Sequence, residues 1–341
     1  MESSNILRQV PPGPPPTFAN LVHFYTKNES HEYLARLLQI WTHTTEKDHE
    51  LMGGALHRAI FKGDETAVRM MLDAGVSPTV HESQDPNYTP LLTAAEEGQR
   101  EIARVLWQLI GSEGRYGPEA HTCLWVAAER GHADLVADLL DIWDGWPMEE
   151  KNDALYGAAR HWHDGVVGVL LSQACFNVDQ LQAALQVSID RQPTPPFAFW
   201  GSRDPVATTE EDLRLERMVC RLVDAGADPD GNLDGTRGGQ TPLLHAAANG
   251  RYRIGALKGL LGRRANVNAQ DKDGKTALHR LFNGPYPSTD SLQVLLQHGA
   301  SSEIADAAGE TEMHAAAARG TPEQLQLCLA ACRSTDVAIR S

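Results

Sequence analysis

The stretch Thr241-Pro242-Leu243-Leu244-His245-Ala246-Ala247, followed by Gly250, decides the fold of this chain because its pattern recurs. A Thr, an apolar step and paired small residues occur at three further places, with a Gly nine residues after the Thr: Thr89 to Gly98, Thr122 to Gly131, and Thr311 to Gly320. An apolar pair such as Leu139-Leu140 comes eight and nine residues after the Gly. A phrase that recurs about every 33 residues predicts stacked copies of one small helical unit.

Each part of this phrase has a physical role in a pair of helices. The Thr can cap the start of a helix, and a Pro suits the first helical turn. The small Ala pairs let neighbouring inner helices come close together. The Gly ends the first helix, because a residue without a Cβ enters the left-handed conformation at low cost. The later Leu pairs face inward from the second helix, so each repeat must pack against its neighbours.

The phrase resembles the ankyrin repeat, whose signature is T-P-L-H-x-A-A, then Gly, a Leu-Leu pair and Gly-Ala-Asp. Weaker copies extend the resemblance over residues 51–331: they begin at Gly54, Ala154 and Thr276, and a degenerate one keeps Gly226-Ala227-Asp228-Pro229. The resemblance implies an all-α ankyrin-repeat solenoid of about eight helix-turn-helix units with finger loops between them. It implies little about function, since one fold can host many functions.

The remaining segments set the expected domain boundaries. Residues 1–27 contain a run of prolines and predict an extended, flexible N-terminus. Residues 28–50 predict an N-terminal helical cap, because apolar residues recur at helical spacing between His31 and Trp41. An insertion at residues 190–210 interrupts one repeat, and residues 332–341 form a C-terminal tail.

Composition and charge exclude several classes of function. The chain of 341 residues carries a net charge of −15, whereas nucleic-acid binding needs clustered Lys and Arg. An acidic field favours basic partners. The five cysteines are scattered without a Cys-x-x-Cys pair, which argues against a disulfide framework or zinc site and for a reducing compartment. The sequence shows no signal-peptide core and no stretch of membrane-spanning length, so we expect a cytoplasmic and/or nuclear protein without a membrane partner.

The sequence also lacks the common catalytic motifs: no nucleophile elbow, no His-Glu-x-x-His and no Gly-x-Gly-x-x-Gly. The most concentrated polar run is Arg160-His161-Trp162-His163-Asp164, and His can act as a base near neutral pH. Its place in a helix-to-helix turn favours surface contacts instead. His57, His279 and His314 occupy the His of the phrase, which in the family mainly bonds neighbouring backbone. We therefore expect no enzyme activity, no catalytic residue, no metal ion and no cofactor.

Aromatic residues are concentrated in the middle repeats. Trp125 and Tyr156 stand where the phrase expects His, and Trp162 stands where it expects Gly. Either these repeats have repacked around larger side chains, or the aromatics line the concave groove as binding anchors, since Trp and Tyr are enriched among hot spots. The insertion adds three aromatic residues: Phe197, Phe199 and Trp200. This loop either packs over the solenoid or is offered to a partner.

In the ankyrin family, the two residues before the Gly of the inner helix face the groove. The resemblance therefore places six pairs in the groove: Phe61 and Lys62, Glu96 and Glu97, Glu129 and Arg130, Arg160 and His161, Ala248 and Asn249, and Ala318 and Arg319. We expect partner contacts from the first four pairs. The three glutamates make one stretch acidic, which favours a basic segment on the partner. A merely solvated face would have the same composition.

The resemblance implies a non-catalytic adaptor, scaffold or regulator, monomeric in isolation, that binds another protein through its concave groove and finger loops. A transcription coregulator is one form, by analogy with ankyrin proteins that dock on DNA-bound factors. The alternative is small-molecule binding or an unusual cyclisation in an aromatic pocket of Trp125, Tyr156, Trp162 and the Phe197–Trp200 loop. In that alternative, His161 or His163 would move a proton. Assembly into an oligomer is a third alternative.

Overall fold

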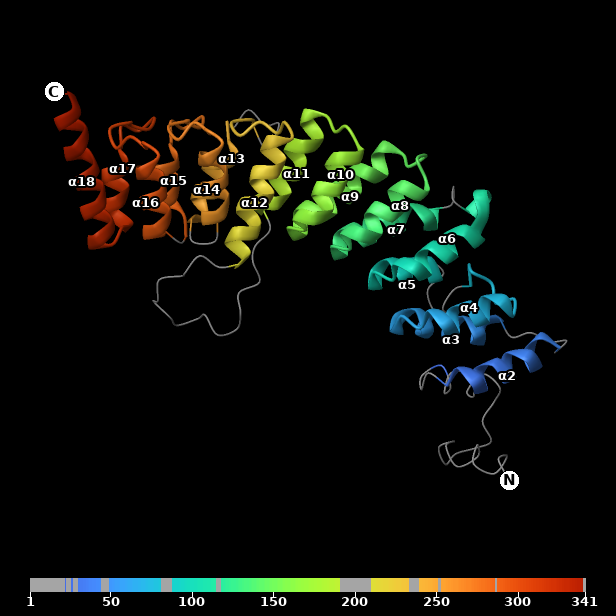
Figure 1. Ribbon diagram of the computed structural model, residues 1–341. Helices are drawn as coiled ribbons and strands as arrows, with labels where there is room; N and C mark the ends of the chain where they lie inside the picture. Colours follow the sequence, from blue (N-terminus) through green and yellow to red (C-terminus); the bar gives the residue numbers. More distant parts are fainter. Residues whose placement is uncertain are drawn as a thin grey trace, which may run out of the picture. The chain divides into compact units, whose positions relative to one another are not determined.

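The computed structural model describes Val22, Thr26 and residues 30–43, 49–80, 88–114, 118–190, 210–232, 239–250, 253–285 and 287–339. The chain divides into two compact units, Met1–Ala154 and Leu155–Ser341. Both are built from α-helices joined by turns (Figure 1). Over the described ranges, β-structure is limited to one isolated bridge between Ala305 and Thr311. The predicted all-α fold of helix-turn-helix units is confirmed.

The first unit alternates inner and outer helices. The inner helices are α3 (His49–Lys62), α5 (Pro90–Glu97) and α7 (Pro118–Arg130); the outer helices are α4 (Glu65–Asp73), α6 (Arg100–Gly114) and α8 (Ala133–Ile142). Inner helices pack on the inner helix of the next repeat, and outer helices do the same. Helix α2 (His31–Thr42) packs on α4 in the manner of an outer helix and buries Leu34, Leu38 and Trp41.

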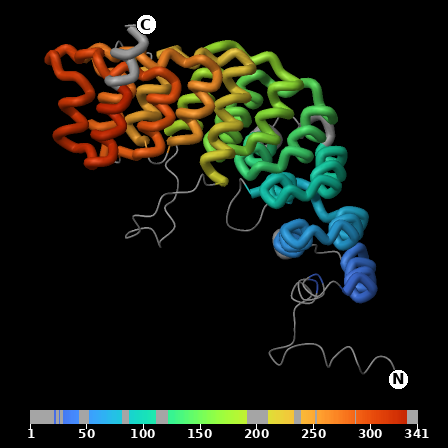
Figure 2. The backbone as a smooth tube through the Cα atoms, turned by 60° about the vertical axis from the view of Figure 1, so that its left-hand side comes forward, coloured from blue at the N-terminus to red at the C-terminus, as the bar shows by residue number. Residues whose placement is uncertain are grey.

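The second unit continues the alternation after α9 (Met148–His161), which crosses the boundary between the units. Its inner helices are α11 (Val178–Asp190), α13 (Pro242–Ala248), α15 (Ala277–Asn283) and α17 (Glu312–Arg319). Its outer helices are α10 (Asp164–Gln173), α12 (Glu210–Asp224), α14 (Ile254–Gly262), α16 (Thr289–Gln297) and α18 (Pro322–Ile339). Each row packs in chain order, as Figure 2 shows for the helices from α11 to α18.

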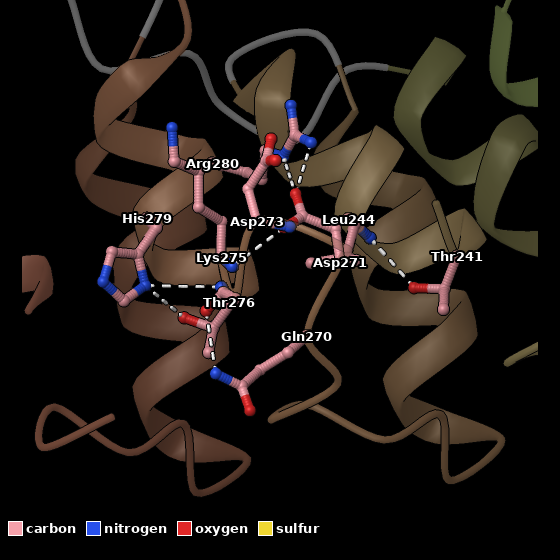
Figure 3. A network of polar contacts seen from close by, with 10 residues as sticks. Thr241, Leu244, Gln270, Asp271, Asp273, Lys275, Thr276, His279 and Arg280 are labelled. Atoms are coloured by element: carbon pink, nitrogen blue, oxygen red, sulfur yellow. Dashed lines mark hydrogen bonds and ion pairs between the residues drawn. The ribbon is translucent and has the colours of Figure 1, made fainter. Parts of the chain in front are cut away.

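Helix starts follow from the Thr of the recurring phrase. In α13 the Thr241 side chain accepts a hydrogen bond from the Leu244 backbone N–H at 3.4 Å. In α15, Thr276 and His279 cap reciprocally (Figure 3). Helix α17 repeats this arrangement with Thr311 and His314. These bonds supply partners for backbone N–H groups that have no carbonyl partner within the helix.

The core of each unit is made of small and aliphatic side chains from both rows of helices. Leu106, Ala127 and Leu139 in the first unit are at most 1% exposed. Leu257 and Leu281 in the second unit are 0% exposed. Burying one Leu contributes about 2 kcal/mol, so stacking of repeats supplies most of the stability. None of the helices in the described part of the chain is both long and apolar enough to cross a membrane.

Helices α12 and α14 approach each other closely because α14 presents glycines to its neighbour. A Cβ added at Gly255 would lie 2.1 Å from the backbone oxygen of Asp212. A Cβ at Gly259 would lie 3.0 Å from a methyl carbon of Val219. The absence of side chains at these two positions therefore sets the spacing of the outer helices.

Candidate functional site

The inner helices of the first unit end at a Gly in the left-handed conformation, as the phrase predicts. Gly63, Gly98 and Gly131 have φ values of 71°, 68° and 86°. The side chains that precede these glycines, together with Trp125, are only partly covered by the fold. We call them the inner-helix face of the first unit: Phe61, Lys62, Glu96, Glu97, Trp125, Glu129 and Arg130.

Two aromatic side chains give this face its apolar character. Phe61 is 62% exposed at the end of α3, and Trp125 is 37% exposed on α7. His57 holds the position in α3 that corresponds to Trp125, but it is 4% exposed and hydrogen-bonds to the Thr93 hydroxyl at 2.7 Å. Trp125 therefore places an indole at the surface. At the same position of the repeat that contains α3, the His57 imidazole is buried and hydrogen-bonded.

Glu96 is held by three residues of the same unit. The Tyr88 hydroxyl donates a hydrogen bond to its Oε2 at 2.7 Å, and the Arg130 guanidinium pairs with its Oε1. The ring Nε2 of His132 bonds to the Glu96 backbone oxygen at 2.8 Å. The charge of Glu96 is thus compensated within the protein, and the face is less acidic than the sequence alone suggests.

The predicted residues of the next repeat lie in the second unit. Tyr156 is 42% exposed on α9, and Arg160 is exposed one turn later on the same helix. His161 is half-buried, and its ring stacks on that of His163 with a centroid distance of 6.0 Å. These side chains offer a mixed aromatic and basic surface.

Trp162 behaves differently from the other predicted anchors. Its φ of 59° is left-handed, and its N–H bonds to the Ala159 oxygen at 3.2 Å, as Gly63 and Gly131 bond at the ends of α3 and α7. The indole is 6% exposed, and its Nε1 donates a hydrogen bond to the Ser188 backbone oxygen at 2.8 Å. The left-handed backbone costs a non-Gly residue about 1–2 kcal/mol, which burial of the indole offsets. This burial corrects the expectation that Trp162 lines an open groove, because the repeat has repacked around it.

A cluster of three tryptophans in the first unit was not foreseen. Trp107 of α6 is 0% exposed, and its ring centroid lies 5.9 Å from that of Trp143 and 5.4 Å from that of Trp146. The Trp146 Nε1 donates a hydrogen bond to the Leu139 backbone oxygen at 2.8 Å. Two of the three residues follow α8 outside the recurring phrase, so its spacing gave no signal for them.

Three members of the aromatic pocket in the small-molecule alternative are described. Trp162 is buried, and Trp125 and Tyr156 are 37% and 42% exposed. Phe197, Phe199 and Trp200 lie outside the described residues and remain predictions. Within the described part of the chain, no group of three or more His, Cys, Asp or Glu side chains is arranged to hold a metal ion.

The finger loops of the second unit are closed by aspartates. The Asp271 side chain is 0% exposed, and its Oδ1 accepts hydrogen bonds from the backbone N–H groups of Asp273 and Lys275, both at 2.9 Å. The Arg280 guanidinium donates to the other carboxylate oxygen at 2.8 Å (Figure 3). The next finger repeats the turn with Asp306, and its bonds to backbone N–H groups lower the pKa of that carboxyl.

Comparison with known proteins agrees with this architecture. A family model for ankyrin repeats, with three copies, matches residues 212–306. A stretch of 117 residues is 32% identical to the human SH3 and multiple ankyrin repeat domains protein 2. This stretch is 34% of the present chain and 6% of that protein, so the chain matches only a small part of that relative.

Two solved structures also align with the chain. The ankyrin repeat domain of Bcl-3, described as a unique member of the IkappaB family, is 18% identical with a TM-score of 0.40 over 80% of this chain and 96% of that one. The human ASB11 ankyrin repeat domain is 20% identical with a TM-score of 0.49 over 72% and 98%. Ankyrin repeats indicate a protein–protein interaction domain. Residues 212–306 are therefore matched as ankyrin repeats, and helix pairs built on the same phrase run through both units.

Proposed function

We propose that this protein is a non-catalytic adaptor or regulator that binds a segment of another protein on the inner-helix face of its first unit. The observation that carries the proposal is the exposure of Phe61 and Trp125 on this face. Large apolar side chains at a polar-rimmed surface are typical of protein-binding sites, and Trp is enriched among residues that dominate binding energy.

The two aromatic side chains supply affinity, and the charged neighbours supply selectivity. Truncation of an aromatic hot spot costs about 2 kcal/mol or more of binding free energy. Glu97 and Arg130 belong to the same face as the aromatics and favour a partner with charges in a matching order. Glu96 serves mainly to hold Tyr88 and Arg130 in place.

A partner segment with apolar side chains and flanking Lys or Arg fits this face best. The net charge of −15 supports this choice, because an acidic protein attracts basic segments over a distance. Since Glu96 is already paired with Arg130, the electrostatic contribution is modest. Affinity should therefore fall only moderately with added salt.

Tyr156 and Arg160 are exposed in the second unit, and we propose them as contact residues of that unit by itself. Transcription coregulation is the narrower form of the proposal: the partner is then a DNA-bound factor, and the protein acts in the nucleus as well as the cytoplasm. A reporter assay with the protein tethered to a promoter-binding domain tests this form. Unchanged transcription of the reporter would rule out the coregulator role but would not contradict the binding proposal.

Photo-crosslinking from single positions tests the binding face directly. A benzoylphenylalanine at Trp125 should crosslink to the partner in native cells. The same probe at Leu109, which is 54% exposed on the outer helix α6, should not. Crosslinks of equal yield from both positions, or from Leu109 alone, would place the partner elsewhere and overturn the proposal.

A mutant series complements the crosslinking. The double variant Phe61→Ser, Trp125→Ala should lower capture of the crosslinked partner at least tenfold, since each truncation removes a main apolar contact. Leu109→Ala is the matched control that removes an equally exposed apolar side chain from another face. Circular dichroism should show unchanged helicity for both proteins.

A further inference from the structure

Glu312 is an acidic residue in a position that other repeats fill with an uncharged one. It is the first residue of α17 and is 0% exposed. Pro90 and Pro242 hold the corresponding places at the starts of α5 and α13, and both are buried. Neither carboxylate oxygen of Glu312 makes a hydrogen bond of good geometry among the described residues, although the nearby Ser302 hydroxyl favours the charged form. A buried carboxyl group with so little compensation is driven to take up a proton.

Among the described residues, the surroundings of Glu312 offer no compensating positive charge. In the preceding finger, the Ser302 hydroxyl favours the charged carboxylate, whereas Glu303 is itself negative and disfavours it. Helix α15, which packs on α17, carries His279 and Arg280. The Arg280 guanidinium binds Asp271, and His279 bonds to the Thr276 hydroxyl and to the Glu310 backbone oxygen.

Helices α17 and α18 also supply no described positive charge to Glu312. Helix α18 contributes Glu323, a like charge, to the described side chains near its start. On α17 itself, His314 caps Thr311, and Arg319 donates a hydrogen bond to the Asn283 backbone oxygen at 3.1 Å. Each described basic side chain on α15 and α17 is therefore engaged by a group other than Glu312.

We propose that Glu312 is a pH-sensitive switch that controls the docking of the repeat formed by α17 and α18. With a proton, its neutral carboxyl is tolerated in the core, and α17 stays packed on α15. Without the proton, the buried charge gains solvation by exposure, and this repeat opens locally. Outside their own repeat, α17 and α18 pack mainly on α15 and α16, so they can open without the rest of the second unit.

The direction of the pH effect follows from the two states. Burial raises the pKa of Glu312 to about 7 in the docked repeat, whereas the ordinary value is 4.5. The opened repeat binds fewer protons between these values, so opening becomes more favourable as pH rises through this window. The opening constant should rise on the order of 50-fold between pH 5 and pH 8, and should level off above pH 7.

Hydrogen exchange of the full chain, read by mass spectrometry from pH 5 to pH 8, tests the switch. After correction for the intrinsic exchange rate, the protection factors of residues 312–331 should fall on the order of 50-fold between pH 5 and pH 8. Protection of α14 should not change in parallel. Glu312→Gln keeps the shape and removes the ionisation, so its protection should not vary with pH. Glu323→Gln removes an exposed carboxylate nearby and should keep the wild-type pH profile.

Two outcomes would overturn the proposal. One is a pH profile of Glu312→Gln that matches the wild type. The other is a direct titration of the wild-type Glu312 carboxyl by carbon-13 NMR that gives a pKa near 4.5. The NMR titration needs no variant, so it decides the matter even if Glu312→Gln does not fold. Glu312→Pro, which restores the residue of α5 and α13, is a second variant that should be independent of pH.

Discussion

The indole Nε1 of Trp162 donates a hydrogen bond to the backbone oxygen of Ser188 at 2.8 Å, although the Trp162 backbone is left-handed. This bond ties the end of α9 to α11 within the second unit. A position that favours Gly for its backbone has thus become a packing position for the largest side chain.

At position 162 the left-handed backbone favours Gly, whereas the core favours a large side chain. These two effects predict that the glycine variant is more stable than the alanine variant. Trp162→Ala should lower the free energy of unfolding by about 3–5 kcal/mol, because it loses the buried indole. Trp162→Gly should be less damaging by about 1 kcal/mol, because Gly relieves the left-handed strain. Urea unfolding at neutral pH measures both. If the alanine variant were more stable than the glycine variant, the backbone at position 162 would not be strained for a residue with a side chain.

The close approach of α12 and α14 predicts that one added methyl group is harmful. Gly255→Ala should destabilise the second unit by about 1–3 kcal/mol, since its Cβ would meet the Asp212 backbone oxygen at 2.1 Å. Gly262→Ala, in the same helix, has no neighbouring atom within 4 Å and is the matched control. It should be neutral or stabilising by up to about 1 kcal/mol. Equal thermal unfolding of the two variants would rule out the steric argument.

An ion pair between α6 and α8 predicts a pH-dependent part of the stability. Asp138 is 5% exposed; Arg100 donates to its carboxylate at 2.5 and 2.8 Å, and Arg104 at 2.9 Å. These bonds, chiefly from Arg100, hold the pKa of Asp138 below 3.8. Asp138→Ala should cost about 1–2 kcal/mol at pH 7, because both arginines are partly exposed and screened.

The sign of the pH effect makes this prediction specific. A lowered pKa means that the stabilisation is complete above pH 3.8 and is lost as pH falls through the lower, folded-state value. The difference in unfolding free energy between wild type and Asp138→Ala should therefore shrink below pH 3.8 and stay constant from pH 5 to pH 7. A constant difference down to pH 2 would show that the ion pair is not its source.

The packing of the finger loops predicts that alanine destabilises the protein to different extents at two glycines with similar backbone conformations. Gly274 and Gly309 have φ values of 74° and 79°, so alanine is strained at both by about 1 kcal/mol. A Cβ at Gly274 would also lie 2.9 Å from the Ala307 backbone nitrogen in the next finger, whereas Gly309 has no atom within 4 Å. Gly274→Ala should be the more destabilising in urea unfolding by about 1 kcal/mol. Identical midpoints would contradict the stacking of the fingers.

The sequence predicts the parts of the structure that depend on neighbouring residues. Helix starts at Thr241 and Thr276 and the left-handed helix end at Gly98 follow from local backbone chemistry. The left-handed end predicted at Gly320 is wrong, because this residue has an extended backbone with a φ of −76°. The left-handed turn at Trp162 could also be inferred from its place in the phrase. The direction of its indole could not, because Ser188 lies 26 residues away.

The same limit applies to the inner-helix face of the first unit. Its members follow from spacing, and the structure places Phe61 and Trp125 partly in solvent. The pairing of Glu96 with Arg130 joins residues 34 positions apart. Composition does not reveal such a pairing, so it overestimates the negative charge of this face. The buried carboxyl of Glu312 was missed because a glutamate at a helix start is ordinarily solvent-exposed and favourable.

The aspartates that close the fingers have a consequence for how this protein can evolve. Because Asp271 and Asp306 hold their loops by bonds to main-chain N–H groups, the loop shape does not depend on the side chains at the tips. Exposed tip residues such as Lys272 are therefore free to change identity while the scaffold persists. Descendants of this chain could acquire new recognition specificities there without any search for a new fold.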